Sequence, residues 1–256
     1  MEQQATHSQG ATNGARISGF DTLRGFSVIS MVLFHFCYDL TELSGVSLSW
    51  FKPPFEDIWR ASISWLFLVI AGCMCAYSRN NLKRGLQYSG VALVIFLVTY
   101  LAKVDTPISF GIIYCMGFST LLYALLEKIG LKPKGPVAAC VLSICFLATL
   151  HLQTRNVGIG GLTIAVPDVL YSSEALSWLG LPGPTFASGD YYPPLPYSLL
   201  YLVGTIAGAK IKECGCPNWF KDLRVPVLDF FGKHALLVYA IHQPILLVIA
   251  NLMAVA

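Results

Sequence analysis

The sequence has few charged residues. Asp, Glu, Lys and Arg make up only 12% of its 256 residues, which is about half of their share in a typical soluble domain. Hydrophobic residues make up 55%, and the mean hydropathy is +0.63. The net charge of +3 does not call for a nucleic-acid partner. This composition argues against an ordinary soluble domain and predicts an all-α bundle of membrane-spanning helices.

The sequence also lacks the motifs of several familiar protein classes. It contains no P-loop, no dinucleotide-binding glycine pattern, no heptads and no convincing internal repeat. The lack of an inverted repeat counts against an ordinary secondary transporter. Most of the eight cysteines lie in apolar stretches, where cysteine behaves as a small hydrophobe, so no disulfide framework is expected. Cys214 and Cys216 alone are too few for a zinc site, and no metal is predicted.

Seven apolar stretches predict about seven transmembrane helices. A helix needs about 20 apolar residues to cross a bilayer, and the stretches lie at approximately 20–40, 59–78, 86–102, 108–126, 136–151, 195–211 and 232–252. Residues 1–15 are polar and are predicted to form a disordered cytoplasmic segment before a single domain at 16–256. That segment lacks the apolar core of a signal peptide, so we expect the first helix to stay uncleaved.

The placement of Lys and Arg predicts the orientation of the helices. With the N-terminus in the cytoplasm, thirteen of the seventeen basic residues lie inside, as the positive-inside rule favours. The longest connection, at about 152–194, then lies outside. Such long connections are usually lids or binding segments, and the carboxylate of Asp190 and the ring of Tyr191 suit a sugar-like acceptor. Alternatively, this segment only covers the helix ends.

The first apolar stretch carries Asp21, Arg24, His35 and Asp39. Ionisable side chains in a membrane usually face the protein interior or a watery cavity, and pair there. His35 and Asp39 are four residues apart and adjacent on a helix, so Asp39 could orient the imidazole for general-base catalysis. Asp21 and Arg24 could pair with each other or simply anchor the helix. His35 could instead be a structural histidine between helices.

A second polar group lies in the last apolar stretch. His242 and Gln243 fall near its middle and precede Pro244, which frees a backbone carbonyl. This pattern indicates either a kinked, inward-facing site or a hydrogen bond that packs two helices. Tyr114 is a lone phenol in another apolar stretch, where a packing role is commoner than a catalytic one.

Basic and small residues suggest two further contacts. Arg79, Lys83 and Arg84 lie in a short inner loop and would suit the phosphates of a cytoplasmic donor, although positive-inside bias explains them equally well. Gly204 and Gly208 permit close helix packing, either within the chain or between two subunits of a homodimer. Membrane lipid is an expected partner in either case.

Six segments, in this order, resemble the catalytic domain of heparan-α-glucosaminide N-acetyltransferase in its small bacterial form. They span most of the chain. The spacing of Arg24 and His35 in the first apolar stretch is also similar to that of membrane acyltransferases that O-acetylate surface polysaccharides. The segments are Asp21-Thr-Leu-Arg24-Gly25, His35 with Asp39, Asn81-Leu-Lys-Arg84-Gly85, Phe110-Gly111-Ile-Ile-Tyr114-Cys-Met-Gly117, Ser188-Gly-Asp190-Tyr-Tyr-Pro193 and Tyr239-Ala-Ile-His242-Gln243-Pro244.

The resemblance implies an enzyme of the bacterial inner (cytoplasmic) membrane. It would move an acetyl group from cytoplasmic acetyl-CoA to an amino sugar or another glycan on the far side. By motif, His35 is the expected catalytic residue, with Asp39 beside it. The imidazole would either deprotonate the acceptor or carry the acetyl group itself.

Two other functions fit the same residues. One is O-acetylation of a polysaccharide. The other is a small transporter or channel whose buried His, Asp and Arg side chains relay protons or bind an ion. A transferase must bind CoA, whereas a transporter should move its solute across liposomes without CoA.

Overall fold

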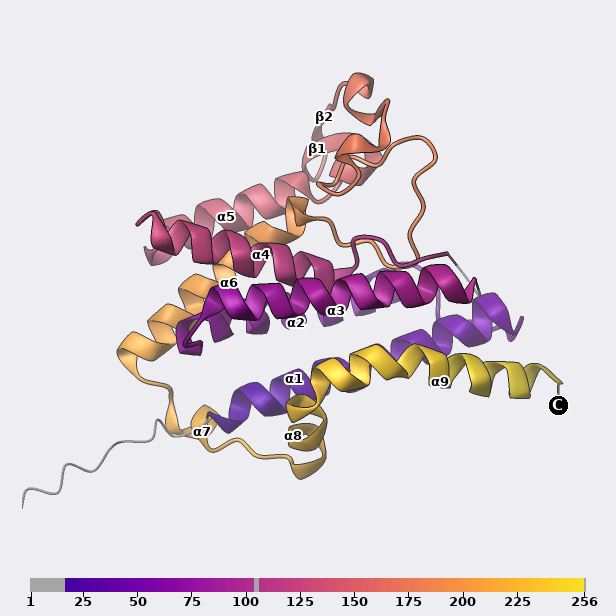
Figure 1. Cartoon of the computed structure of the whole chain (residues 1–256), viewed down its shortest axis with the longest axis horizontal. Helices are drawn as coiled ribbons and strands as arrows, with labels where there is room; N and C mark the ends of the chain where they lie inside the picture. Colours follow the sequence, from indigo (N-terminus) through magenta and orange to yellow (C-terminus); the bar gives the residue numbers. More distant parts are fainter. Residues whose placement is uncertain (1–16, 104–105, 256) are drawn as a thin grey trace, which may run out of the picture.

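The fold was analysed in a computed structural model that describes residues 17–103 and 106–255. The predicted segment at 1–15 lies outside these residues. Each predicted apolar stretch forms a helix, and the long helices lie side by side as a bundle (Figure 1). They are α1 (Ser18–Tyr38), α2 (Phe55–Cys73), α3 (Asn81–Ala102), α4 (Ile112–Lys128), α5 (Gly135–Thr149), α6 (Pro194–Cys214) and α9 (Ala235–Val255), with the short α7 (Asn218–Lys221) and α8 (Pro226–Lys233) between the last two.

Fewer of these helices meet the requirements of a membrane span than the sequence predicts. Within the described residues, four segments are long and apolar enough: Ser18–Leu43, Phe55–Tyr77, Asn81–Ala102 and Gly135–Thr154. A fifth is added if α8 and α9 count as one bent span. The fold is therefore mostly helical, with four or five candidate spans.

The bend in the last segment lies at an unexpected place. The sequence indicates either a kinked site or a packing hydrogen bond near Pro244, and α9 continues through this proline. A sharp turn of 88° lies further back, between α8 and α9, at His234. As a result, α8 lies against α1 near its N-terminal end, while α9 packs along the rest of α1.

Glycines bring α2 and α6 together at backbone contact. A Cβ atom on Gly204 would overlap the carbonyl oxygen of Val69, and one on Gly208 would overlap that of Cys73. The two glycines therefore serve packing within one chain, and they supply no argument for a homodimer.

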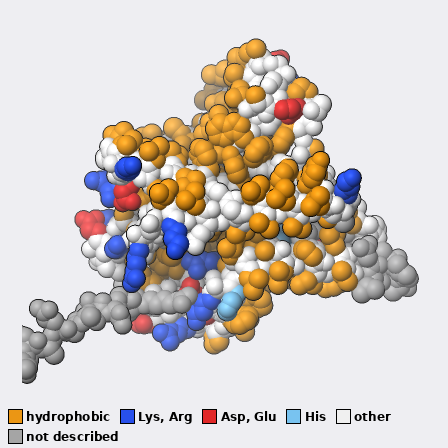
Figure 2. All heavy atoms as spheres, in the orientation of Figure 1, with side chains coloured by type: hydrophobic (Ala, Val, Ile, Leu, Met, Phe, Trp, Pro, Cys, Tyr) orange, Lys and Arg blue, Asp and Glu red, His pale blue; other side chains and the backbone are white. Residues whose placement is uncertain are grey.

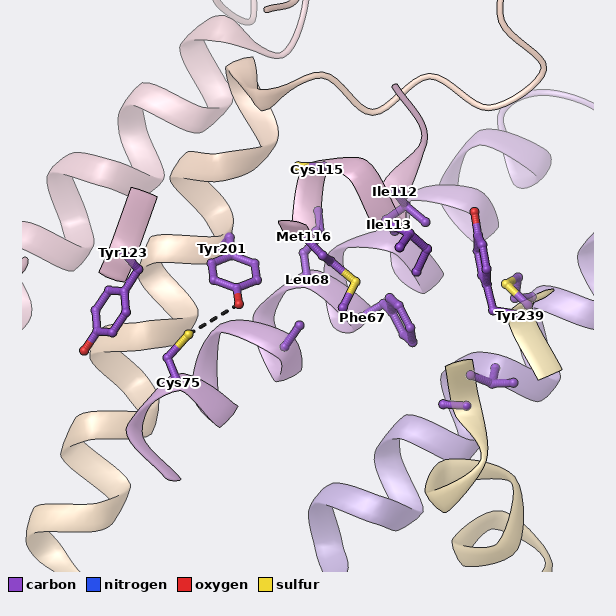
Figure 3. Close-up of a cluster of buried hydrophobic side chains, with 14 of the residues drawn as sticks. Phe67, Leu68, Cys75, Ile112, Ile113, Cys115, Met116, Tyr123, Tyr201 and Tyr239 are labelled. Carbon is purple, nitrogen blue, oxygen red and sulfur yellow. Dashed lines mark hydrogen bonds between the residues drawn. The ribbon is translucent and has the colours of Figure 1, made fainter. Parts of the chain in front are cut away.

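The core of the bundle lies between α1, α2, α4, α6 and α9. Leu68 and Cys115 are completely buried there, and Figure 3 shows Tyr239 reaching towards Ile112 and Ile113 at one side of this cluster. Further along the core, the hydroxyl group of Tyr201 lies 2.6 Å from that of Thr120. Buried hydroxyl groups are thus paired with each other inside an otherwise apolar interior.

Residues 150–193 form a small folded unit, here called the cap, above one end of α5 (Figure 1). It contains a hairpin of β1 (Asn156–Ile159) and β2 (Leu162–Ala165), the one departure from an all-α fold in the part of the chain that the structure describes. The hydroxyl of Tyr171 donates to the carbonyl of Leu152 at 2.6 Å in its interior. Glu174 accepts the backbone N–H and hydroxyl of Thr185, and these bonds lower the pKa of its carboxyl.

Charged side chains are unevenly distributed over the surface. Figure 2 shows most Lys and Arg side chains gathered at one end of the bundle, with hydrophobic side chains covering its flank. At this basic end α2, α4 and α6 finish, and α3 and α5 begin. The cap lies beyond the other end of α5. The positive-inside rule would place this basic end in the cytoplasm, and the N-in orientation stays a prediction.

Candidate active site

Two histidines from opposite ends of the chain face each other in the bundle. His35 lies in the last turn of α1 and is partly buried, whereas the side chain of His242 in α9 is only 8% exposed. Their ring centroids are 5.0 Å apart and the rings are inclined at 54°. The packing of α9 against α1 therefore joins two of the sequence-predicted site residues.

His242 is held on its inner side by the backbone of its own helix. Its Nδ1 atom lies 2.7 Å from the carbonyl oxygen of Tyr239. Its Nε2 atom is buried and has no hydrogen-bond partner among the described residues. The ring of Tyr239 lies beside that of His242, with centroids 5.7 Å apart.

The carboxylate of Asp39 is bound by Gln243. Asp39 begins a π-helical turn (Asp39–Leu43) directly after α1 and is completely buried. The side-chain amide of Gln243 donates to both of its oxygens, at 3.0 and 3.1 Å. The predicted hydrogen bond between packed helices is thus present at Gln243. The expected contact of Asp39 with His35 stays a prediction.

The Asp21-Thr-Leu-Arg24-Gly25 motif fastens α1 to α8. Asp21 and Arg24 form an ion pair at 3.2 Å, and Arg24 also donates to the carbonyl of Gly232 at 3.3 Å. The hydroxyl of Thr22 donates to the carboxylate of Asp229. This confirms the predicted pairing of Asp21 and Arg24, and it shows that part of the motif has an anchoring role.

A basic cavity of about 250 Å³ opens beside this anchor. Three cationic residues line it: Arg24, Arg84 and Lys233. The Arg84 guanidinium donates to the carbonyl of Ala71 at 2.8 Å and to the hydroxyl of Tyr88 at 3.2 Å, so this charge has a fixed position.

The structure separates the three basic residues that the sequence assigned to a donor. Only Arg84 lines the basic cavity, while Arg79 and Lys83 are exposed and are not among its lining residues. Lys233 was missed because it lies far along the chain, at the end of α8. Lys233 comes to line the same cavity as Arg24 and Arg84 only when α8 packs against α1.

A second, mostly apolar cavity of about 430 Å³ lies between α3, the start of α4 and α9. Its wall includes Phe96, Phe110, Ile113, Tyr114 and Tyr239. Ile113 also lines the basic cavity, so the two spaces adjoin each other. Tyr239, which lines the apolar cavity, lies against His242, with ring centroids 5.7 Å apart.

Asp190 joins the cap to this apolar cavity. One oxygen of its carboxylate accepts both the backbone N–H of Ile112 and the hydroxyl of Tyr239, each at 3.1 Å. Burial raises the pKa of Asp190, although these two hydrogen bonds oppose the shift. A Cβ atom on Gly111 would lie 2.7 Å from the same carboxylate, so only glycine fits there without displacing it.

The neighbouring predicted acceptor residue, Tyr191, is engaged elsewhere. Its hydroxyl donates to the carbonyl of Ser177 at 2.5 Å, inside the cap. Tyr239, to which the sequence assigned no role, is the residue that lines the cavity and binds Asp190. Its position three residues before His242 was the available signal, because residues three apart share a helix face.

All eight cysteines are free thiols. No group of three or more His, Cys, Asp or Glu side chains within residues 17–103 and 106–255 could hold a metal ion.

The fold and the site define a helical membrane protein whose first and last helices bring two histidines together, and which also holds a basic cavity. The family model of heparan-alpha-glucosaminide N-acetyltransferase, catalytic, matches residues 16–244. The chain belongs to this family, which confirms the resemblance seen in the sequence. Together with the apolar helices, membership indicates a membrane acetyltransferase. Comparison with curated proteins and with solved structures found no match.

Proposed function

We propose that the protein transfers an acetyl group from cytoplasmic acetyl-CoA to an amino sugar or another glycan on the far side of a bacterial cytoplasmic membrane. One observation carries this proposal beyond family membership. The basic cavity and the apolar cavity share Ile113 in their walls, and Tyr239, which lines the apolar one, lies against His242. Acetyl-CoA cannot cross a bilayer, so the protein has to bind it from the cytoplasmic side. Its charged phosphate end suits a basic cavity, and its uncharged thioester arm suits an apolar cavity that adjoins the first.

The basic cavity suits the phosphate end of the donor. Cationic side chains bind phosphate oxygens by charge-assisted hydrogen bonds, and Arg24, Arg84 and Lys233 supply three positive charges. The exposed Arg79 and Lys83 would raise the local concentration of an anionic donor by long-range attraction. The pantetheine arm and the acetyl thioester would then occupy the apolar cavity.

His35 is the residue that we assign to the chemical step. As a general base, its imidazole would take a proton from the acceptor nitrogen while the new bond to the acetyl carbon forms and the C–S bond breaks, releasing the CoA thiolate. As a carrier, it would attack the acetyl carbon itself and pass the acetyl group on in a second step. Asp39 supports this end of α1 through its bonds to Gln243.

The acceptor would approach from the cap. Asp190 stands between the cap and the apolar cavity, where its carboxylate could accept hydrogen bonds from a sugar. Tyr114 lines the same space. Tyr191 would act indirectly, by shaping the cap around Asp190.

Thermal unfolding of the detergent-purified protein with acetyl-CoA, CoA or neither tests the donor site. Because ligands that bind only the native state stabilise it, both CoA species should raise the Tm of the wild type. His35→Ala should keep this rise and lose the release of CoA from acetyl-CoA in the presence of glucosamine. His151→Ala, an exposed histidine of the cap, is the matched control. If saturating concentrations of acetyl-CoA and of CoA both leave the Tm of the wild type unchanged, the proposal is contradicted.

O-acetylation is the main enzymatic alternative, and the product distinguishes it. A product that mild alkali cleaves is an ester and identifies a hydroxyl acceptor, whereas an amide resists this treatment.

A proton-relay transporter is the non-enzymatic alternative, because the buried polar pairs of α1 and α9 could also conduct protons. It predicts proton flux in liposomes without CoA, and loss of that flux in His35→Ala.

A further inference from the structure

The hydrogen bond of His242 fixes which of its ring nitrogens carries the proton. Nδ1 lies 2.7 Å from the carbonyl oxygen of Tyr239. A carbonyl oxygen can only accept a hydrogen bond, so Nδ1 must be the donor. In a neutral imidazole the other nitrogen then bears a lone pair. His242 therefore presents Nε2 as a hydrogen-bond acceptor.

In the part of the chain that the structure describes, Nε2 of His242 is a buried hydrogen-bond acceptor without a donor, which is unusual in a protein interior. The side chain of His242 is more than nine-tenths buried, and Nε2 has no partner among the described residues. Buried polar atoms nearly always have hydrogen-bond partners, so an exception calls for an explanation. The aromatic rings that lie against His242 are those of Tyr239, in its own helix, and His35. Of these two, only His35 carries ring N–H groups.

We propose that His242 is the positioning residue of His35, and that its Nε2 accepts the ring N–H of His35 during the reaction. This inference rests on the proposed acetyl transfer. The ring centroids are 5.0 Å apart, which is close enough for a hydrogen bond between ring nitrogens once these are turned towards each other. Catalytic hydrogen bonds are often long in structures without substrate and tighten when substrate binds.

The pairing gives His35 a defined direction. With one ring N–H turned towards His242, the other nitrogen of His35 presents its lone pair to the substrate. When that nitrogen takes the acceptor proton or bonds to the acetyl carbon, the ring becomes positively charged. Its inner proton then moves to Nε2 of His242, which leaves His35 neutral. The proton returns when His35 releases the proton or the acetyl group that it had taken.

Gln243 supports this arrangement from the adjacent position of α9. Its amide nitrogen binds both oxygens of Asp39, which holds α9 against the end of α1. Asp39 thus contributes through Gln243 by fixing the helix that carries His242.

Nuclear magnetic resonance of the full chain labelled with 15N-histidine tests the pairing without any need for catalysis. The His242 signals are those that disappear in His242→Gln. We expect His242 to be protonated at Nδ1 and unprotonated at Nε2. The Nε2 signal should move in His35→Phe, which keeps a ring but removes the N–H. Protonation of Nε2 would overturn the proposal, and so would an Nε2 signal that has the same position in the wild type and in His35→Phe. Both outcomes can be read whether or not the protein transfers acetyl groups.

Kinetics then separate a positioning role from a purely structural one. His242→Gln keeps a side-chain acceptor but cannot hold a proton, and His242→Phe keeps only the ring. Loss of base assistance should lower kcat for CoA release by about 100-fold in both variants, with the KM for acetyl-CoA unchanged. His151→Gln is the control and should behave as the wild type. Wild-type kcat in His242→Phe would overturn the assignment, as would loss of the acetyl-CoA-induced rise in Tm along with kcat. A wild type without transfer activity would count against the proposed function, and the labelling experiment would still decide the pairing.

Discussion

Gln243 donates its side-chain amide to both carboxylate oxygens of Asp39, at 3.0 and 3.1 Å. Asp39 is completely buried, so these bonds compensate for part of the cost of removing its carboxylate from water. The contact also fixes the last helix against the end of the first. Because His242 precedes Gln243, the same contact sets the position of His242 relative to His35.

Removing the Gln243 amide should destabilise the protein. Gln243→Leu leaves the buried carboxylate of Asp39 without two of its hydrogen bonds, and we expect the free energy of unfolding to fall by about 1–3 kcal/mol. Thermal unfolding in detergent measures this loss. Gln87→Leu, at an exposed position of α3, is the matched control. Equal changes in the two variants would show that the bond to Asp39 contributes nothing specific.

Lys233 provides a test of the basic cavity that does not disturb packing. Unlike Arg84, whose guanidinium binds the carbonyl of Ala71, Lys233 is exposed. Lys233→Ala should weaken acetyl-CoA binding roughly five- to tenfold, as expected for one partly solvated ionic contact of about 1 kcal/mol. Titration calorimetry at two salt concentrations should also show a weaker salt dependence in the variant. Lys128→Ala, an exposed lysine at the end of α4, should bind as the wild type does, and an equal loss there would point to net charge alone.

Much of the fold could be predicted because lipid-facing helices need long apolar stretches. The helix positions followed from this requirement, and so did the long connection that forms the cap. The bend at His234 could not be predicted, because neither proline nor glycine occurs at that position. It depends on the docking of α8 against α1, where a Cβ atom on Gly232 would overlap the backbone of Asp21.

The candidate site was only partly visible in the sequence. Intramembrane polar residues identified His35, Asp39, His242 and Gln243 individually, because each is unusual in an apolar stretch. Their partners could not be predicted, since pairing depends on how α9 docks against α1. Tyr239 opens one of the segments that carry the family resemblance, but the sequence assigned it no role because its partner Asp190 lies 49 residues away.

Gly208 should not tolerate a side chain. A methyl group there would overlap the carbonyl oxygen of Cys73 and force α2 and α6 apart. We expect Gly208→Ala to lower the Tm markedly, with a loss of about 1–3 kcal/mol from overpacking. Gly90→Ala is the matched control, because a Cβ atom there has no neighbour within 4 Å and alanine favours a helix by about 1 kcal/mol. An unchanged Tm in Gly208→Ala would mean that the two helices separate easily.

Asp190 should make the stability of the protein depend on pH. Burial raises the pKa of its carboxyl in the folded state, so the folded protein binds this proton more tightly than the unfolded chain does. The stabilisation by the protonated group is therefore complete below the ordinary carboxyl pKa of about 4, and it is lost as the pH rises through the raised pKa. Unfolding curves between about pH 4 and pH 8 should show the wild type losing stability relative to Asp190→Asn over this range.

Two variants make the test of Asp190 specific. Tyr239→Phe removes a hydroxyl that donates to the carboxylate and favours its charged form. The pKa of Asp190 should rise further in this variant, and the loss of stability should move to higher pH. Asp222→Asn, at an exposed position, should follow the wild type at every pH. If wild type and Asp190→Asn differ by the same amount throughout, ionisation of Asp190 has no influence on folding. A shift to lower pH in Tyr239→Phe would contradict the bond between Tyr239 and Asp190, and with it the link between the cap and the apolar cavity.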